Sequence, residues 1–320
     1  MKDTFELRGP GRKRREFLGM AAGLGAALAL PGRPALAAEA PLMTRPVPRT
    51  GERLPVVGLG TAIVFDIGDD AARRAERRKV LETMLAGGAT LVDTAPSYGT
   101  AESVVGDLLA QMGAREKAFL ATKVRAAGRD AAIAEMQQSL VRLRTKNLDL
   151  MQWHNVGTDL AEVAAQIALL REWKEQGIVR YIGVTHFQER ANDRLVDILG
   201  REKLDFVQVN YSLAERSVEE RVLPAAAAAG TAVLCNLPFG RGKLFAAVRG
   251  RQVPEWAAEF GATTWGTFFL KYLLAHPAVN CVIPGSDRPE YMADNLNAGR
   301  GRLPDAAQRR KIVEFWNSLG

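Results

Sequence analysis

Residues that bind metals are scarce in this chain. It has three histidines and two cysteines among 320 residues. His154, His186 and His276 are widely spaced, so they do not form the closely spaced ligand set of a zinc site. We therefore expect no metal centre.

An excess of charge is also lacking over most of the chain. The formal net charge is +7, but residues 1–37 hold seven basic residues and two acids, a net +5, which leaves +2 for residues 38–320. A nearly neutral body gives no electrostatic basis for binding nucleic acid, so we expect none as a partner.

The apolar run near the start is too short to span a membrane. It covers 17–30, which is 14 residues, whereas a spanning helix needs about 20. Arg14-Arg15 precede the run, and Ala35 and Ala37 follow it as a small-residue cleavage site. A basic region, an apolar run and such a site in this order predict a secretory signal, and the paired arginines indicate the twin-arginine route. A basic amphipathic helix and an uncleaved anchor are the alternatives.

The expected product is a single exported domain. We predict a twin-arginine signal peptide over 1–37, cleavage after Ala37, and a periplasmic domain over 38–320 with no stable membrane span. The export machinery is then one partner of the chain. The remaining 283 residues fit one large α/β domain.

Strand-like and helix-like segments alternate through the body of the chain. The expected strands are 56–61, 90–95, 118–124, 148–154, 181–186, 206–210, 231–236 and 280–285. The expected helices are 71–86, 101–111, 129–143, 160–176, 190–199, 218–229, one within 255–275, 289–298 and 305–319. Eight strand–helix units predict an α/β fold with a closed (β/α)₈ TIM barrel. The alternative, an open doubly wound sheet, needs a longer glycine-rich turn than the "GLGT" of the first strand.

Four ionisable residues fall where the barrel rule places active sites, at the carboxyl ends of strands. Asp93 ends the second expected strand and Tyr98 follows it, Lys123 ends the third, and His154 ends the fourth. Each alone could be a cap, a turn residue, a solvated lysine or part of a core pair. Their joint position is the signal, because burying an acid and a lysine together is costly unless they pair.

The motifs around these residues resemble the aldo-keto reductase family. "DTAPSYG", "LATKV" and "QWHN" are similar to the segments that carry the family's catalytic tetrad. "GLGT", "YIGVTHF", "VQVNYS", "PFGRG" and "IPGSDRPEYMADNL" resemble other family segments and occur in family order between about 54 and 299. The resemblance implies an NAD(P)H-dependent oxidoreductase that reduces an aldehyde or ketone to an alcohol, or runs the reverse reaction.

The chemistry of that reaction assigns a role to each of the four residues. A carbonyl that accepts a hydride on carbon needs a proton on oxygen, which Tyr98 can supply as a general acid. A cationic Lys123 is expected to lower the pKa of Tyr98, and Asp93 to hold Lys123 in place. His154 can donate a hydrogen bond that orients the carbonyl oxygen.

The resemblance also implies a nicotinamide cofactor, NADP(H), with NAD(H) possible as well. The cofactor-binding residues it implies are Gly60, Thr61, Asp93, Thr185, His186, Gln208, Asn236, Leu237, Phe239, Gly240, Arg241, Ser286, Arg288, Asp294 and Asn295. Thr185-His186 replace the family's Ser-Asn pair for the carboxamide, and Asn236 stands where the family often has an aromatic residue. Gly240-Arg241-Gly242 either closes over the pyrophosphate or simply makes a tight turn.

The preference between the two nicotinamides depends on one cation at the adenine end. Arg288 is the only cation in "IPGSDRPEYMADN", Asp287 beside it opposes a phosphate, and Ser286 adds a hydroxyl. We expect a modest preference for NADPH; equal use of both cofactors is the alternative.

Two other classes of protein fit the same motifs. One is a non-catalytic barrel that binds nicotinamide as a redox sensor or binds a partner. The other is an exported dehydrogenase-like enzyme that recycles a trapped cofactor. The complete tetrad favours an enzyme.

Cys235 and Cys281 fall on neighbouring strands. A disulfide fits an oxidising compartment, but we favour two buried thiols because adjacent barrel strands seldom offer disulfide geometry.

Overall fold

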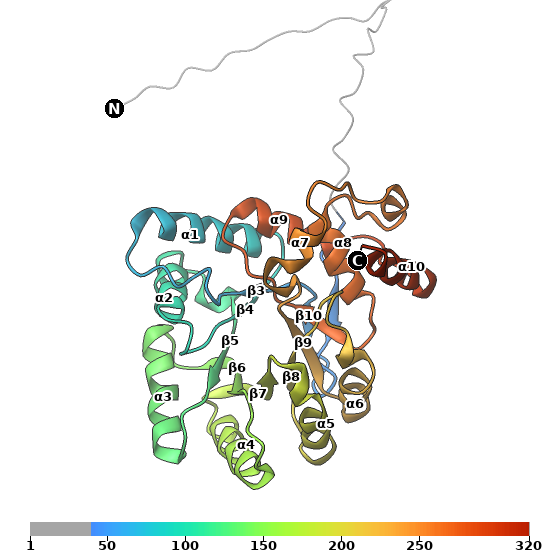
Figure 1. Cartoon of the computed structure of the whole chain (residues 1–320). Coiled ribbons are helices and arrows are strands. Elements are labelled where there is room, and N and C mark those ends of the chain that lie inside the picture. Colours follow the sequence, from blue (N-terminus) through green and yellow to red (C-terminus); the bar gives the residue numbers. More distant parts are fainter. Residues whose placement is uncertain (1–39, 320) are drawn as a thin grey trace, which may run out of the picture. The chain divides into compact units, whose positions relative to one another are not determined.

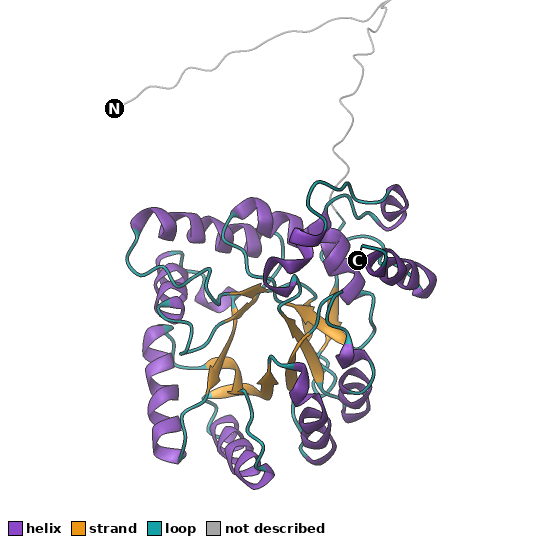
Figure 2. Cartoon of the chain, viewed as in Figure 1, coloured by secondary structure: helices purple, strands orange, loops and turns teal. Residues whose placement is uncertain are grey.

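The computed structural model describes residues 40–319, so the predicted signal over 1–37 lies outside the described residues. Eight parallel strands form one sheet (Figures 1 and 2). They are β3 (Leu59–Gly60), β4 (Leu91–Asp93), β5 (Phe119–Val124), β6 (Leu148–His154), β7 (Val179–His186), β8 (Phe206–Asn210), β9 (Ala232–Asn236) and β10 (Val279–Val282). Each strand pairs with the next along the chain.

The sheet closes on itself between its first and last strands. Parallel bridges join Val57 to Val282 and Gly60 to Gly285, and the Gly60 amide donates to the Pro284 carbonyl over 3.0 Å. A Cβ on Gly60 would lie 2.7 Å from the Ile283 carbonyl oxygen, so this close approach requires glycine. The predicted barrel is therefore confirmed, and the open doubly wound sheet is excluded.

Helices surround the strands (Figure 2). They are α1 (Ala71–Ala86), α2 (Ala101–Gln111), α3 (Arg129–Arg142), α4 (Leu160–Glu175), α5 (Asn192–Arg201), α6 (Val222–Ala229), α7 (Lys243–Ala247), α8 (Trp265–Leu274), α9 (Pro289–Ala298) and α10 (Ala306–Asn317). Side-chain caps explain several starts: Asp70 accepts from the Arg73 amide, and Thr264 and Asp305 each form a capping box. None of the helices among residues 40–319 has the length and apolar character needed to cross a membrane.

Two expected helices are divided in the structure. The segment 218–229 contains a 3₁₀ turn at Ser217–Glu219 before α6, which carries Pro224 near its start, where the missing N–H is tolerated. The segment 255–275 contains a 3₁₀ helix at Glu255–Phe260 and then α8, because Gly261 adopts the left-handed conformation between them.

A hairpin that the sequence patterns did not predict covers the amino-terminal end of the barrel. Its strands are β1 (Thr44–Pro46) and β2 (Arg53–Pro55). Val47 and Leu54 from the hairpin join the barrel's interior core. The other members of that core are Leu91, Phe119, Ala121, Leu150, Tyr181, Phe206, Ala232, Leu234, Cys281 and Ile283.

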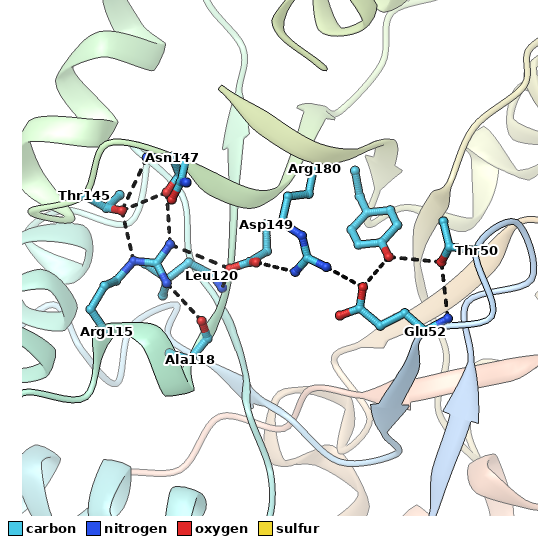
Figure 3. Close-up of polar contacts among 10 residues, drawn as sticks. Thr50, Glu52, Arg115, Ala118, Leu120, Thr145, Asn147, Asp149 and Arg180 are labelled. Atoms are coloured by element: carbon cyan, nitrogen blue, oxygen red, sulfur yellow. Dashed lines mark hydrogen bonds and ion pairs between the residues drawn. The ribbon is translucent and has the colours of Figure 1, made fainter. Parts of the chain in front are cut away.

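A chain of charged residues fixes the hairpin to the strands (Figure 3). Glu52 pairs with Arg180, which also donates to Asp149 over 2.8 Å, and Arg115 lies 3.7 Å from the same carboxylate. The second oxygen of Asp149 accepts from the Leu120 amide on β5 over 2.8 Å. This end of the barrel is therefore occupied by structural contacts, and the opposite end is left for a site.

The side chains of the two cysteines lie on opposite faces of the sheet. Cys281 belongs to the interior core, whereas Cys235 belongs to the core between the strands and the helices. Both are free and fully buried, and burial raises the pKa of each thiol. They are unreactive packing residues, as favoured from the sequence.

Candidate active site

The carboxyl ends of β4, β5 and β6 bring the four predicted catalytic residues together. Asp93 is the last residue of β4, Lys123 the penultimate residue of β5, and His154 the last residue of β6. Tyr98 lies in the turn between β4 and α2, where its amide donates to the Ala95 carbonyl over 3.1 Å. The roles of the four in a reaction remain predictions.

Lys123 and Asp93 form a buried ion pair. Lys123 Nζ lies 2.6 Å from Asp93 Oδ2 and donates to the Thr94 carbonyl over 2.9 Å. The side chains are 0% and 3% exposed. Burial alone would lower the pKa of Lys123, but the Asp93 carboxylate and the nearby Tyr98 oxygen outweigh it, so the pKa is raised. The lysine is a stable cation.

Tyr98 lies beside this cation, with its ring centroid 4.9 Å from Lys123 Nζ. The Lys123 charge lowers the pKa of Tyr98, as expected from the sequence, but it does not bring that pKa below its usual value. Burial raises the pKa of the phenol by more than the Lys123 charge lowers it. Tyr98 is therefore a protonated acid at neutral pH.

His154 is the third polar group at this point. Its ring meets the Tyr98 ring edge to face, with centroids 6.0 Å apart and planes at 86°. Burial, followed by the positive charges of Lys123 and Arg125, lowers the pKa of His154 to about 3. The imidazole is therefore neutral and has one N–H to donate. Its buried Nδ1 has no hydrogen-bond partner among residues 40–319.

Two buried glutamines orient the Asp93 carboxylate. Gln208 Nε2 donates to Asp93 Oδ1 over 2.7 Å, and Gln152 Nε2 donates to the same oxygen over 3.2 Å. Gln152 was not predicted from the sequence. The available signal was its position on β6 two residues before His154, which puts both side chains on one face of the strand.

Gln208 also connects Asp93 to two residues of the predicted cofactor set. Its Oε1 accepts from Asn236 Nδ2 over 3.2 Å and from Thr185 Oγ1 over 3.4 Å. Asn236 Oδ1 is buried and has no partner within the described part of the chain. His186 follows Thr185 and is half-buried, and its Nδ1 accepts from the Gln188 amide over 3.1 Å.

A cavity of about 450 Å³ lies at the ends of β7, β8 and β9. Its lining includes Leu237, Gly240 and Arg241 from the predicted cofactor set, and Phe187. Arg241 has a left-handed backbone with φ 54°, and its guanidinium lies 5.9 Å from the Phe187 ring centroid. Phe239 packs instead on Phe245, with ring centroids 4.9 Å apart. The rest of the lining is polar or charged: Gln188, Glu189, Arg190, Asn210, Glu215 and Lys243.

Thr61, which directly follows β3, is hydrogen-bonded to the backbone of Asp93. It is buried, and its hydroxyl donates to the Asp93 carbonyl over 2.9 Å. Gly60 before it closes the barrel as described above. Both residues therefore have structural functions that place β3 against β4.

The predicted adenine-end residues gather between β10 and α9. Ser286 and Asn295 are buried, and Asn295 Nδ2 donates to Ser286 Oγ over 2.8 Å. Asp294 accepts from Thr264 Oγ1 over 2.8 Å and so supports the cap of α8, a contact that the sequence analysis missed. Arg288 is exposed at the start of α9, with its guanidinium 5.9 Å from the Tyr291 ring centroid.

One further cation near Arg288 was not predicted. Arg77 on α1 is only 5% exposed, and its guanidinium donates to the carbonyls of Val64 and Asp287. Asp287 is also one of the charges that act on Arg77. The acid next to Arg288 is therefore partly offset by a buried arginine.

Comparisons with known proteins agree with this geometry. A sequence model described as the aldo/keto reductase family matches residues 56–315. The chain is 33% identical over 192 residues to Aldo-keto reductase YhdN of Bacillus subtilis (strain 168), which covers 55% of this chain and 56% of the relative. It is 37% identical over 175 residues to Methylglyoxal reductase YeaE of Escherichia coli (strain K12), covering 53% of this chain and 59% of the relative. These alignments thus span little more than half of each relative.

A solved structure is similar over a larger share of the chain. It is an aldo/keto reductase from Klebsiella pneumoniae in complex with NADP and acetate, with a TM-score of 0.71 and 25% identity, covering 83% of this chain and 93% of that one. The matched family segment includes every residue of the Asp93, Tyr98, Lys123 and His154 cluster. The chain belongs to the aldo/keto reductase family.

Proposed function

We propose that this protein reduces a small aldehyde or ketone to an alcohol with a reduced nicotinamide cofactor, or runs the reverse reaction. The observation that carries the proposal is the convergence of four groups at one end of the barrel. A buried Lys123–Asp93 ion pair of 2.6 Å lies beside a protonated Tyr98 and a neutral His154. Family membership and the methylglyoxal reductases among the relatives support the same chemistry.

In the proposed reaction these residues move one proton and orient one oxygen. The Tyr98 hydroxyl gives its proton to the carbonyl oxygen as the carbonyl carbon accepts a hydride. Lys123 stabilises the phenolate that remains, because it is a buried cation held in place by Asp93. The neutral His154 donates a hydrogen bond to the same oxygen, which polarises the carbonyl.

Residues at the end of β9 and in the loop that follows it fit a nicotinamide cofactor. Asn236 Oδ1 is a buried acceptor without a partner among residues 40–319, which suits the N–H of a carboxamide. Arg241 and Lys243 line the cavity and suit a pyrophosphate. The cofactor, NADP(H) or NAD(H), would supply the hydride. NADP complexes of aldo/keto reductases among the similar structures favour NADP(H).

The location of the reaction is part of the proposal. Arg14-Arg15 and the Ala35-Leu36-Ala37 site support export by the twin-arginine route and a periplasmic enzyme. That route carries folded proteins, so a cofactor bound before export would travel with the chain.

Turnover of methylglyoxal and of simple aldehydes tests the function. The full chain is incubated with NADPH or NADH, and the loss of reduced-nicotinamide absorbance is followed. We expect substrate-dependent oxidation of the cofactor that Lys123→Met abolishes. Binding of NADPH without oxidation by any carbonyl compound would contradict the proposal and favour a nicotinamide-binding sensor.

A further inference from the structure

Arg125 lies immediately beyond the catalytic end of β5. The register pairs Lys123 with Gln152 and Val124 with Trp153, so the next pair in the same register is Arg125 with His154. Val124 and Trp153 belong to the core outside the sheet, whereas Ala121 and Leu150 belong to the barrel interior. Because side chains alternate along a strand, His154 faces the same side as Gln152, and continuing the alternation of β5 by one residue places Arg125 on the side of Lys123.

The backbone at Arg125 is fixed even though its side chain is exposed. Glu135 Oε2 on α3 accepts from the Arg125 amide over 2.6 Å and from the Ala126 amide over 3.0 Å. This contact defines the direction in which the chain leaves β5. The position of the Arg125 backbone at the barrel mouth is therefore fixed.

The guanidinium of Arg125 has no ion pair or hydrogen bond within residues 40–319, unlike those of Arg115, Arg142 and Arg180, which lie against carboxylates. Its charge still acts on the His154 ring. Lys123, the other cation near that ring, is neutralised by Asp93. Arg125 is thus a cation whose guanidinium has no partner in the described part of the chain, and its charge reaches the group that would orient the substrate carbonyl.

We propose that Arg125 binds a carboxylate on the substrate, and that the enzyme's substrates are small oxo acids. This inference rests on the proposed function. A planar guanidinium can hold a carboxylate through two parallel hydrogen bonds, which also fixes the orientation of an adjacent carbonyl group. Neighbouring strands are about 4.8 Å apart, so the backbones that carry Arg125 and His154 are close enough for one small molecule to contact both side chains.

The reaction balances for such a substrate. The carbonyl carbon of a 2-oxo acid accepts the hydride, which oxidises the reduced nicotinamide, and the carbonyl oxygen accepts the proton of Tyr98. The product is the 2-hydroxy acid with its carboxylate unchanged. Tyr98 regains its proton from solvent.

The test compares pyruvate with methyl pyruvate, which differ in the negative charge. Both are assayed with the full-length wild type and with the variants Arg125→Gln, Arg125→Lys and Arg129→Gln. The last variant is the control, because Arg129 is an exposed arginine at the start of α3 that pairs with Glu172 on α4. The ratio of the two kcat/KM values cancels the intrinsic reactivity of the ester. We expect Arg125→Gln to lower this ratio about tenfold to a hundredfold, mainly through the KM of pyruvate. Arg125→Lys should recover part of the loss, and Arg129→Gln should keep the wild-type ratio.

Binding of oxamate, an unreactive analogue of pyruvate, separates this inference from the proposed function. Oxamate is titrated calorimetrically into the full chain with NADP⁺, and Arg125→Gln should weaken it by a similar factor. If the enzyme reduces methyl pyruvate and Arg125→Gln leaves the ratio of the two kcat/KM values unchanged, the role of Arg125 is overturned. The proposed function still stands in that case. Arg125-dependent oxamate binding without turnover of either compound would support the carboxylate site and overturn the proposed function.

Discussion

Gln208 on β8 donates its side-chain amide to Asp93 on β4 over 2.7 Å, across the interior of the barrel. The same glutamine accepts from Asn236 over 3.2 Å, so one side chain joins the acid that holds Lys123 to a residue of the predicted cofactor set. The family resemblance implied that Gln208 is a direct cofactor ligand. In this structure one N–H of its amide donates to Asp93 and its oxygen accepts from Asn236, so Gln208 couples the two halves of the site.

Replacing Gln208 with leucine should destabilise the barrel. The change leaves Asp93 Oδ1 with Gln152 alone and deprives the Asn236 amide of its acceptor. Unpaired buried polar groups cost about 1–3 kcal/mol, so the free energy of urea unfolding should fall by that amount. Gln111→Leu at the exposed end of α2 is the control. If Gln208→Leu and Gln111→Leu had the same free energy of unfolding, the contact between Gln208 and Asp93 would not contribute to stability.

The barrel and the catalytic cluster could be predicted because they depend on local order in the sequence. Apolar runs that end in Asp93, Lys123 and His154 mark the ends of strands, and parallel strands bring those ends to one face. The glutamine partners of Asp93 and the threonine partner of Asp294 could not be predicted, because Gln208 and Thr264 reach these acids only through the strand register and helix packing. The pKa of Tyr98 was missed because its direction depends on burial, which one sequence does not reveal.

Removing the hydroxyl of Tyr98 should abolish most of the activity and leave the fold intact. A general acid contributes about 10²–10⁴-fold, so kcat of Tyr98→Phe should fall by at least that factor on any aldehyde that the wild type reduces. Tyr291→Phe is the matched control, since Tyr291 is 55% exposed and the change keeps the ring that lies against Arg288. Undiminished turnover by Tyr98→Phe would remove the phenol from the mechanism and favour another acid.

Acid should destabilise the protein partly through His154. Its folded-state pKa of about 3 lies below the ordinary value of 6.5, so the unfolded chain binds a proton that the folded chain rejects. Stability is therefore lost as the pH falls from about 6.5 towards 3, by up to a few kcal/mol. Replacing His154 with glutamine should remove this part of the loss, measured as the difference in unfolding free energy between pH 7 and pH 4. The pKa values of His186 and His276 are also lowered by burial, but they affect both proteins equally. The same pH dependence in both proteins would mean that His154 is not held neutral by the fold.

Export should depend on the paired arginines. Lysines at both positions, Arg14→Lys with Arg15→Lys, should stop the chain from reaching the periplasm of a host that has the twin-arginine pathway, because that pathway reads the arginine pair itself. The wild-type periplasmic product should begin at Ala38 by mass spectrometry. Mature enzyme in the periplasm from the double variant would contradict the predicted route, and an intact Met1 there would contradict the predicted cleavage.

Arg288 should determine the preference between NADPH and NADH. It is exposed at the first turn of α9, where helix amides also favour an anion, and it lies beside Ser286. Asp287 opposes a phosphate less than the sequence suggested, because Arg77 lies against it. A charge-assisted contact contributes about 1.5–3 kcal/mol. Because Arg288 is exposed, its contribution should lie near the lower end of that range, which is about a tenfold change in Kd.

Fluorescence titration of Arg288→Ala should show this loss for NADPH alone, and added salt should reduce the difference from wild type. Arg78→Ala, which removes an exposed arginine paired with Glu82 on α1, should bind both cofactors as the wild type does. If Arg288→Ala weakened both cofactors equally, or neither, Arg288 would not contact the 2′-phosphate, and the buried Arg77 would be the next cation to substitute.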